Sequence, residues 1–133
     1  MSDDARVPAD VLERSPAPSG TGCLDCEQTG GWWFHLRRCV ECGHIGCCDD
    51  SLAQHATRHY EATGHRYLRS FEPGEAWFWD YAADAPLRGG ELPDPQQHPL
   101  DQGAPGPSDR VPADWQHQLT DAQERRGSRA AGR

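Results

Sequence analysis

Two cysteine pairs, each with two residues between the thiols, are the residues of this 133-residue chain best suited to chemistry. Cys23 and Cys26 form the first pair, and Cys39 and Cys42 form the second. Two intervening residues let both sulfurs reach one ion from a tight turn. Further residues of ligand type follow in the chain: Cys47, His55, His59 and His65. Thiolate and imidazole in sets of four suit Zn²⁺, so these eight residues predict two closed zinc sites.

The spacing leaves open how the eight ligands divide between the two ions. His55 and His59 are four residues apart and would share one face of a helix, which favours a single ion for both. The alternative is an interleaved arrangement, in which each ion takes ligands from distant parts of the chain. Both arrangements are compatible with the residues alone.

Six cysteines in a short chain would also fit the disulfide framework of a secreted protein. Residues 1–4, however, are Met-Ser-Asp-Asp, and no apolar run of signal-peptide length follows them. We therefore expect a cytoplasmic protein in a reducing environment, where thiolates are free to bind metal. No stretch approaches the length that crosses a bilayer, so no membrane partner is expected.

One thiol, Cys48, is left over after the eight ligands are assigned. It could replace its neighbour Cys47 as a ligand, or it could lie buried as a free thiol. It also provides an alternative function for the chain, as a thiol- or zinc-responsive redox protein that uses Cys48.

The charge and the residue pattern argue against two common functions. The formal net charge is −8, and all 13 basic residues are arginine. Such a chain repels a phosphate backbone, so no nucleic acid partner is expected. The chain contains no phosphate loop, no Ser-His-Asp order and no paired carboxylates in an ordered context, and four protein ligands leave a zinc ion no open position for water. We therefore do not expect an enzyme.

Composition limits the expected ordered part of the chain to residues 21–83. Hydrophobic residues make up 35% of the chain, beside 14 Gly and 11 Pro, which is low for a domain stabilised by its core alone. Residues 1–20 are predicted to form a flexible tail. Residues 84–133 are rich in Pro and Gly and are predicted to be disordered, apart from a short helix within 110–125 that apolar residues at every fourth position favour.

One main helix and a short antiparallel sheet are expected to position the ligands. Residues 52–63 lack Pro and Gly, follow capping residues and end at Gly64, which predicts a helix of about three turns. Residues 32–36, 67–71 and 76–81 are aromatic or alternating and are predicted to be short strands. The expected fold class is α+β, a small zinc-stabilised domain flanked by disordered tails.

Three stretches of the chain resemble the UBP-type zinc finger in residue order and spacing. Residues 39–47 match C-x2-C-G-x3-C, residues 55–60 contain the H-x3-H pair, and residues 63–65 are Thr-Gly-His. The resemblance spans residues 20–82, roughly half of the chain, and small stand-alone bacterial members of the family resemble the chain most closely.

The resemblance also implies how the ligands pair. One ion would be held by Cys23, Cys26, Cys47 and His55. The other would be held by Cys39, Cys42, His59 and His65. The two sites would then be interleaved, with two structural Zn²⁺ ions in a monomeric protein. Because each site joins distant segments, metal binding would be part of folding.

In eukaryotic members the finger resembles a socket for the free C-terminal Gly-Gly carboxylate of ubiquitin. An arginine two positions after the third motif cysteine holds this carboxylate, and that position is Asp49 here. A carboxylate at this position would repel the carboxylate of the ligand. Four aromatic residues could still line a binding pocket, or could instead fill the small core: Trp33, Trp77, Trp79 and Tyr81.

These observations predict a zinc-binding protein in which two structural ions support a module for peptide or protein interaction. Binding of a ubiquitin tail is not favoured, because of Asp49. A socket for another C-terminal carboxylate or for a small anion is the alternative. The partner is expected to be a protein or peptide that no motif of the chain identifies.

Overall fold

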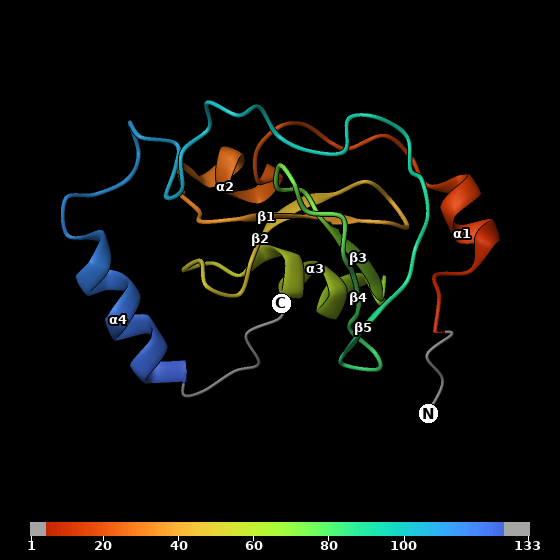
Figure 1. Ribbon diagram of the computed structural model, residues 1–133. Coiled ribbons are helices and arrows are strands. Elements are labelled where there is room, and N and C mark those ends of the chain that lie inside the picture. Colours follow the sequence, from red (N-terminus) through yellow and green to blue (C-terminus); the bar gives the residue numbers. More distant parts are fainter. Residues whose placement is uncertain (1–4, 127–133) are drawn as a thin grey trace.

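The computed structural model describes residues 5–126 of the chain. It is an α+β fold built on a five-stranded antiparallel sheet with the strand order β2-β1-β3-β4-β5 (Figure 1). The strands are β1 (Leu36–Cys39), β2 (Ile45–Cys47), β3 (Tyr67–Ser70), β4 (Phe78–Asp80) and β5 (Ala85–Leu87). The fold class therefore agrees with the one expected from the sequence.

Within the described residues, four helices accompany the sheet: α1 (Ala9–Arg14), α2 (Leu24–Thr29), α3 (His55–Thr63) and α4 (Trp115–Arg126). Helix α3 packs against β1 and β2, and α2 packs against β2. In Figure 1, α1 and α4 lie at opposite sides of this central arrangement. None of the helices in residues 5–126 is both long enough and apolar enough to cross a membrane.

Helix α3 ends where the sequence predicts but begins three residues later. Gly64 ends it with a left-handed conformation (φ 77°), and its amide donates to the carbonyl of Tyr60 at 2.7 Å. Ser51 and Asp49, two of the residues expected to cap this helix, form other contacts instead. Ser51 accepts the amide of Phe34 at 2.9 Å, and the Asp49 carboxylate accepts the hydroxyl of Thr57 at 2.5 Å. The segment before His55 is therefore a loop that contacts the rest of the domain.

Strands β3 and β4 lie within the predicted ranges 67–71 and 76–81, whereas the predicted strand 32–36 is mostly loop. Its backbone groups pair outside the sheet, so β1 begins only at Leu36. The sequence did not predict β2 and β5, which have three residues each. Strands this short provide too few positions for alternation to be recognised.

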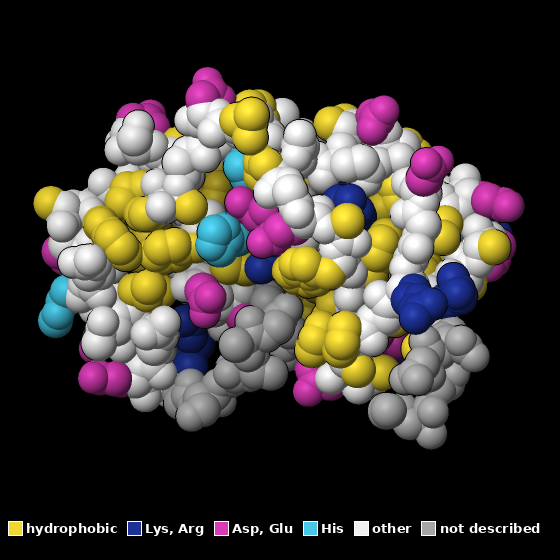
Figure 2. All heavy atoms as spheres, viewed as in Figure 1, with side chains coloured by type: hydrophobic (Ala, Val, Ile, Leu, Met, Phe, Trp, Pro, Cys, Tyr) yellow, Lys and Arg dark blue, Asp and Glu magenta, His cyan; other side chains and the backbone are white. Residues whose placement is uncertain are grey.

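Helix α4 overlaps the range 110–125 expected for a helix, but it begins only at Trp115 and runs one residue further, to Arg126. Figure 2 shows hydrophobic side chains gathered on the side of the molecule where α4 lies. Edge-to-face contacts on this side join Trp115 to Trp32 and to Phe34, at ring-centroid distances of 6.5 and 5.4 Å. This part of the chain is thus anchored to the finger by aromatic contacts.

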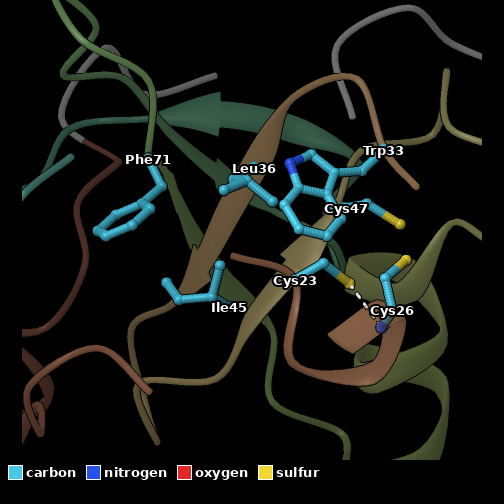
Figure 3. Packing of buried hydrophobic residues seen from close by; sticks show 7 residues of the cluster. All are labelled: Cys23, Cys26, Trp33, Leu36, Ile45, Cys47 and Phe71. Atoms are coloured by element: carbon cyan, nitrogen blue, oxygen red, sulfur yellow. Dashed lines mark hydrogen bonds between the residues drawn. The ribbon is translucent and has the colours of Figure 1, made fainter. Parts of the chain in front are cut away.

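Two clusters of buried side chains make up the core. The first combines three cysteines with apolar residues: Cys23, Cys26, Cys47, Trp33, Leu36, Ile45 and Phe71 (Figure 3). The second is Val7, Val40, Phe78 and Leu92. Thus the sulfurs of one predicted metal site are part of the hydrophobic core, and the second cluster takes one residue from each side of the range 21–83.

Segments outside 21–83 differ from the loose tails expected from composition. Strand β5 lies in the range predicted to be disordered, and Val7 and Leu92 are buried. The guanidinium of Arg38, a fully buried residue, donates to the carbonyls of Pro16 and Pro93 at 2.8 Å each. Burial lowers the pKa of Arg38 to about 10, so it stays charged at neutral pH. The proline-rich stretches have no regular structure, and hydrogen bonds from Arg38 to their backbone carbonyls hold them against the domain.

Candidate metal centres

The first candidate centre, which we call site 1, brings together Cys23, Cys26, Cys47 and His55, with ligand atoms all within 4.8 Å of one another. Cys23 caps α2 by accepting the amide of Cys26 at 3.5 Å, so the first cysteine pair lies on a helical turn. Cys47 ends β2, and His55 is the first residue of α3. Three separate elements thus meet at one point.

The distances at site 1 fit a tetrahedral ion. The Nδ1 atom of His55 lies 3.3 Å from the sulfurs of Cys23 and Cys26 and 3.6 Å from that of Cys47. Zinc bonds of about 2.3 Å to sulfur and about 2.0 Å to nitrogen require a sulfur–nitrogen separation of about 3.5 Å in a tetrahedron. The three sulfur–nitrogen distances are therefore close to those that a tetrahedral Zn²⁺ ion requires.

The second candidate centre, site 2, brings together Cys39, Cys42, His59 and His65 in the same way. Sulfur–nitrogen distances are 3.3 Å from Cys42 to Nε2 of His59 and 3.6 Å from Cys39 to Nδ1 of His65. The two ring nitrogens are 3.3 Å apart. A tetrahedral zinc ion separates two nitrogen ligands by about 3.3 Å, so this set fits as well. The two clusters thus fit two zinc ions.

The two clusters are interleaved, and α3 supplies one histidine to each. This corrects the expectation, from spacing alone, that His55 and His59 share an ion. The two residues stand one turn apart and present different nitrogens, Nδ1 and Nε2, to different sets of sulfurs. Site 1 joins α2, β2 and the start of α3, whereas site 2 joins the end of β1 to the end of α3.

The pKa values of the three thiols at site 1 are displaced in opposite directions. Hydrogen bonds from Cys26 and Cys47 lower the pKa of Cys23 to about 2. The same hydrogen bonds to the Cys23 sulfur raise the pKa of Cys26 to about 12 and hold that of Cys47 far above its usual range. A divalent cation is needed before all three sulfurs can become thiolates.

Site 2 is suited to neutral imidazole ligands. Burial, followed by the nearby His44, lowers the pKa of His59 to about 4, which keeps its ring uncharged at neutral pH. Burial raises the pKa of Cys39 to about 12, so this thiol also depends on a cation to ionise. With two thiolates and Zn²⁺ the site is neutral, whereas three thiolates at site 1 leave one negative charge.

A contact between neighbouring residues connects the two centres. The Asp25 carboxylate, between the two cysteines of the first pair, lies 2.7 Å from Nε2 of His44. The ring of His44 stacks on that of His59, with centroids 4.1 Å apart and planes at 3°. On the other side of site 2, Glu41 accepts the amide of Arg66 at 2.7 Å. Such contacts hold metal ligands in position.

The four aromatic residues expected to line a pocket have different surroundings. Trp33 is 2% exposed and belongs to the core beside site 1 (Figure 3). Tyr81 is also buried, and its ring stacks on Tyr60 at 4.8 Å. Trp77 and Trp79 are half-buried, and the Arg37 guanidinium lies 4.6 Å above the Trp77 ring. The core interpretation therefore holds for two of them, and the other two retain partly open surface.

Asp49 lies beside the Tyr81 group rather than in solvent. It is 9% exposed, and the Thr57 hydroxyl that it binds is 3.3 Å from the hydroxyl of Tyr81. The side-chain amide of Gln54 donates to the Asp49 carbonyl at 3.0 Å. The position that carries the carboxylate-binding arginine in the family pattern thus holds a buried, hydrogen-bonded acid here.

Two groups of residues near the metal centres were not found from the sequence. One is the aromatic contact of Trp115 with Trp32 and Phe34, which the aromatic run and the expected helix could have indicated together. The other is Glu72, whose carboxylate contacts His35 and His98 and accepts the amide of Leu36 at 2.9 Å. No spacing signals the second group, because its members come from distant segments.

A sequence profile of the zinc finger found in ubiquitin hydrolases and other proteins matches residues 23–91, just over half of the chain. The chain belongs to this family. As a member of the UBP-type zinc-finger family, it carries both Cys/His clusters inside the matched region. The match extends beyond residue 83 and includes β5, the strand that composition did not predict.

Individual relatives agree with this assignment. BRCA1-associated protein from *Homo sapiens* and from *Mus musculus* is 32% identical over 83 residues, which are 62% of this chain and 13% of each relative. BRAP2 RING ZnF UBP domain-containing protein 2 of *Arabidopsis thaliana* is 37% identical over 67 residues, 50% of this chain and 12% of the relative. The chain thus spans only about an eighth of the length of these curated relatives.

A solved structure is similar over a larger share of both chains. The solution NMR structure of protein RPA1320 from *Rhodopseudomonas palustris* is 39% identical, with a TM-score of 0.55. The similarity covers 74% of this chain and 95% of that protein. A finger of this type therefore occurs in a small protein as well as in long ones.

Proposed function

We propose that this chain is a non-catalytic interaction module, organised by two structural zinc ions, that binds a protein or peptide partner. In this proposal one ion is held by Cys23, Cys26, Cys47 and His55. The other is held by Cys39, Cys42, His59 and His65. The module acts as a monomer in the cytoplasm and binds neither nucleic acid nor membrane.

The observation that carries the proposal is that each cluster brings together four residues of ligand type. Four protein ligands fill a tetrahedral zinc ion, so in this proposal neither ion keeps a position for a water molecule or a substrate. Zinc bound in this way holds distant segments together and supplies folding free energy instead of catalysis. The name BRCA1-associated protein describes a relative by an association with another protein, which agrees with a binding role.

The geometry favours neither of the two alternative functions. A socket for a carboxylate or small anion needs a free cation beside the sheet. Of the arginines on or next to β1 and β3, Arg37, Arg38 and Arg69 are buried and Arg66 forms a bidentate pair with Asp80. A redox role for Cys48 needs access to oxidant. Its side chain is 2% exposed and lies 3.5 Å from the hydroxyl of Ser51.

Native mass spectrometry of the full chain tests the metal part of the proposal, with two zinc ions per chain as the expected result. One ion or none would contradict the ligand sets. For the binding part, immobilised zinc-loaded protein is compared with protein stripped by a chelator under reducing conditions. Partners retained only by the zinc-loaded form support the module, and equal retention by both forms contradicts it.

Titration with a peptide that ends in a free Gly-Gly carboxylate tests the alternative socket. We expect no saturable binding, because the buried Asp49 carboxylate repels such a ligand. Asp49→Asn removes the negative charge and is the matched variant. Tight binding of the peptide to the unmodified chain would replace the proposed module with the socket.

A further inference from the structure

The C-terminal part of the chain forms a short backbone pairing with the finger. The amide of Trp33 donates to the carbonyl of Gly106 at 2.8 Å, and the amide of Gly106 donates to the carbonyl of Trp33 at 2.9 Å. Trp33 stands in the loop between α2 and β1, so this pairing is separate from the five-stranded sheet. We call residues 102–126 the C-terminal strap.

The pairing is selective for glycine at its centre. A side-chain Cβ on Gly106 would lie 2.5 Å from the carbonyl oxygen of Gly103, which is too close for any other residue without a shift of the backbone. Pro105 and Pro107 flank it and have no amide hydrogen to donate. The strap therefore offers the loop one donor and one acceptor in a stiff segment with little conformational freedom to lose.

An arginine four residues later contacts the same tryptophan. The Arg110 guanidinium lies 5.6 Å from the centre of the Trp33 ring, and its Nε donates to the Gly31 carbonyl at 2.8 Å. Glu27 lies 3.6 Å from its Nη2. A cation above an indole, with a carbonyl and a carboxylate beside it, forms a site for arginine.

The remaining contacts of the strap fix its two ends on the surface of the finger. The side-chain amide of Gln102 donates to the Thr21 carbonyl at 2.6 Å, and the Arg126 guanidinium donates to the Leu52 carbonyl at 3.1 Å. Between them Trp115 packs against Trp32 and Phe34. In Figure 1 the strap follows the outside of the molecule, and its contacts resemble those of a bound peptide: main-chain pairing, one cation and one aromatic anchor.

The strap contributes no residue to the zinc clusters or to the two core clusters. It can therefore leave its position without removing a ligand or a member of either core cluster. Gly31 and the Trp33 backbone, to which the strap hydrogen-bonds, belong to the finger itself. The surface that the strap covers is thus preformed by the zinc-organised domain.

We propose that the strap is an intramolecular ligand, and that the surface at Trp32, Trp33 and Phe34 binds a partner segment of the same chemistry. Such a segment carries Gly-Pro with an arginine four residues after the glycine, as in residues 106–110. This inference rests on the proposed interaction function and names the class of its partner. Because the strap is tethered, its high effective concentration keeps the surface closed until a partner competes.

A labelled synthetic peptide of residues 102–119 tests this in trans against the full chain. The double variant Arg110→Ala and Trp115→Ala, which loosens the strap, should bind the peptide at least about tenfold more tightly than the unmodified chain, as measured by fluorescence anisotropy. Arg125→Ala, on the exposed side of α4, is the matched control and should bind as weakly as the unmodified chain. Equal binding by the double variant and the control would overturn the proposal.

A second variant keeps the test decisive if the double variant folds poorly, as judged by its zinc content. Gly106→Ala in the full chain should open the strap and admit the unmodified peptide, whereas a peptide that carries Gly106→Ala should not bind. Binding of the altered peptide with unchanged affinity would overturn the glycine-specific pairing. Hydrogen exchange of backbone amides gives an independent readout. The amides of Trp33 and Gly106 should exchange at the same rate as each other and faster than the amide of Phe71. If both exchange as slowly as Phe71, the strap is not displaceable and the proposal is overturned.

The outcomes separate this inference from the proposed function. A protein partner that binds the unmodified chain and the loosened variant with equal affinity would support the interaction module and overturn the strap as its competitor. Binding of the labelled peptide to the loosened variant, without any protein that displaces it, would support the intramolecular site and count against the module.

Discussion

The two zinc centres occupy different environments within one small domain. At site 1 all three sulfurs are fully buried and pack with Trp33, Leu36 and Ile45 in the first core cluster. At site 2 only Cys39 is buried, and the other three ligands are partly exposed. Site 1 is therefore part of the core, whereas site 2 holds the end of α3 to the end of β1 near the surface.

This difference shows that a metal can have two structural roles in the same chain. Removing the ion from site 1 leaves thiols with displaced pKa values inside the apolar core, where an added charge is costly. Removing the ion from site 2 frees a turn and a helix end that water can reach. Variants that damage one centre at a time should therefore have unequal effects.

The largest effect is expected from Cys47→Ala at site 1. A structural zinc contributes on the order of 10 kcal/mol to folding, which is comparable with the whole stability of a small domain, so this variant should fail to fold at neutral pH. Near-ultraviolet circular dichroism would detect the loss of ordered aromatic residues, and native mass spectrometry would show that zinc is lost from site 1.

Cys48→Ala is the matched control, because the neighbouring thiol is equally buried but lies outside the cluster. It should keep both ions and lose about 1 kcal/mol of unfolding free energy through the lost sulfur contacts. Loss of zinc from Cys48→Ala together with retention in Cys47→Ala would show that the two cysteines have exchanged roles.

A smaller effect is expected from His65→Ala at site 2. The variant should release one ion and keep the other, because the site 1 ligands and their core cluster do not include His65. Amide exchange should increase near Gly43 and Gly64, where site 2 joins two turns, and should change little at Leu36. If both ions leave together, the centres are one cooperative unit and the comparison between them fails.

The contact between the centres should have a weaker effect of its own. His44→Ala removes the ring that stacks on His59 and pairs with Asp25, while all eight ligands remain. Loss of such a supporting contact lowers metal affinity by about tenfold to a hundredfold, here mainly at site 2. Competition with a chromogenic chelator measures this. Equal affinities in the variant and the unmodified chain would show that the centres are independent.

The ligand types could be predicted from the sequence, and the positions of the elements only in part. Paired cysteines and an H-x3-H spacing are local patterns, so they identify the metal chemistry without a structure. Gly64 marks the end of α3 for the same reason, because a left-handed residue is required there. The division of ligands could not be deduced from spacing, because one helical turn can serve one ion or two.

Composition could not predict how the segments outside residues 21–83 pack against the domain. Prolines and glycines in residues 84–106 suggest a chain without regular structure, yet carbonyls there accept from the buried Arg38 and pair with Trp33. A low content of hydrophobic residues indicates that the chain lacks a conventional core. It gives no information on which backbone carbonyls can accept hydrogen bonds from a buried cation. Sequence patterns record local periodicity, and these contacts have none.

The smallest expected effect concerns His35, which contacts Glu72 beside the site 1 core. The Glu72 carboxylate, 3.3 Å from Nδ1, raises the pKa of His35 above its usual 6.5. A group whose pKa is raised by folding stabilises the fold while it is protonated. Its contribution is therefore complete below about pH 6.5 and is lost as the pH rises through the raised value.

The variant His35→Gln cannot gain this charge, so the difference in unfolding free energy between it and the unmodified chain should be larger at pH 6 than at pH 8.5. The His35 side chain is 45% exposed, so solvent limits the change to no more than about 1 kcal/mol. Urea denaturation at the two pH values, with zinc content checked at both, measures the difference. A difference that is the same at both pH values would mean that His35 acts through packing alone, and a difference that grows toward pH 8.5 would contradict the raised pKa.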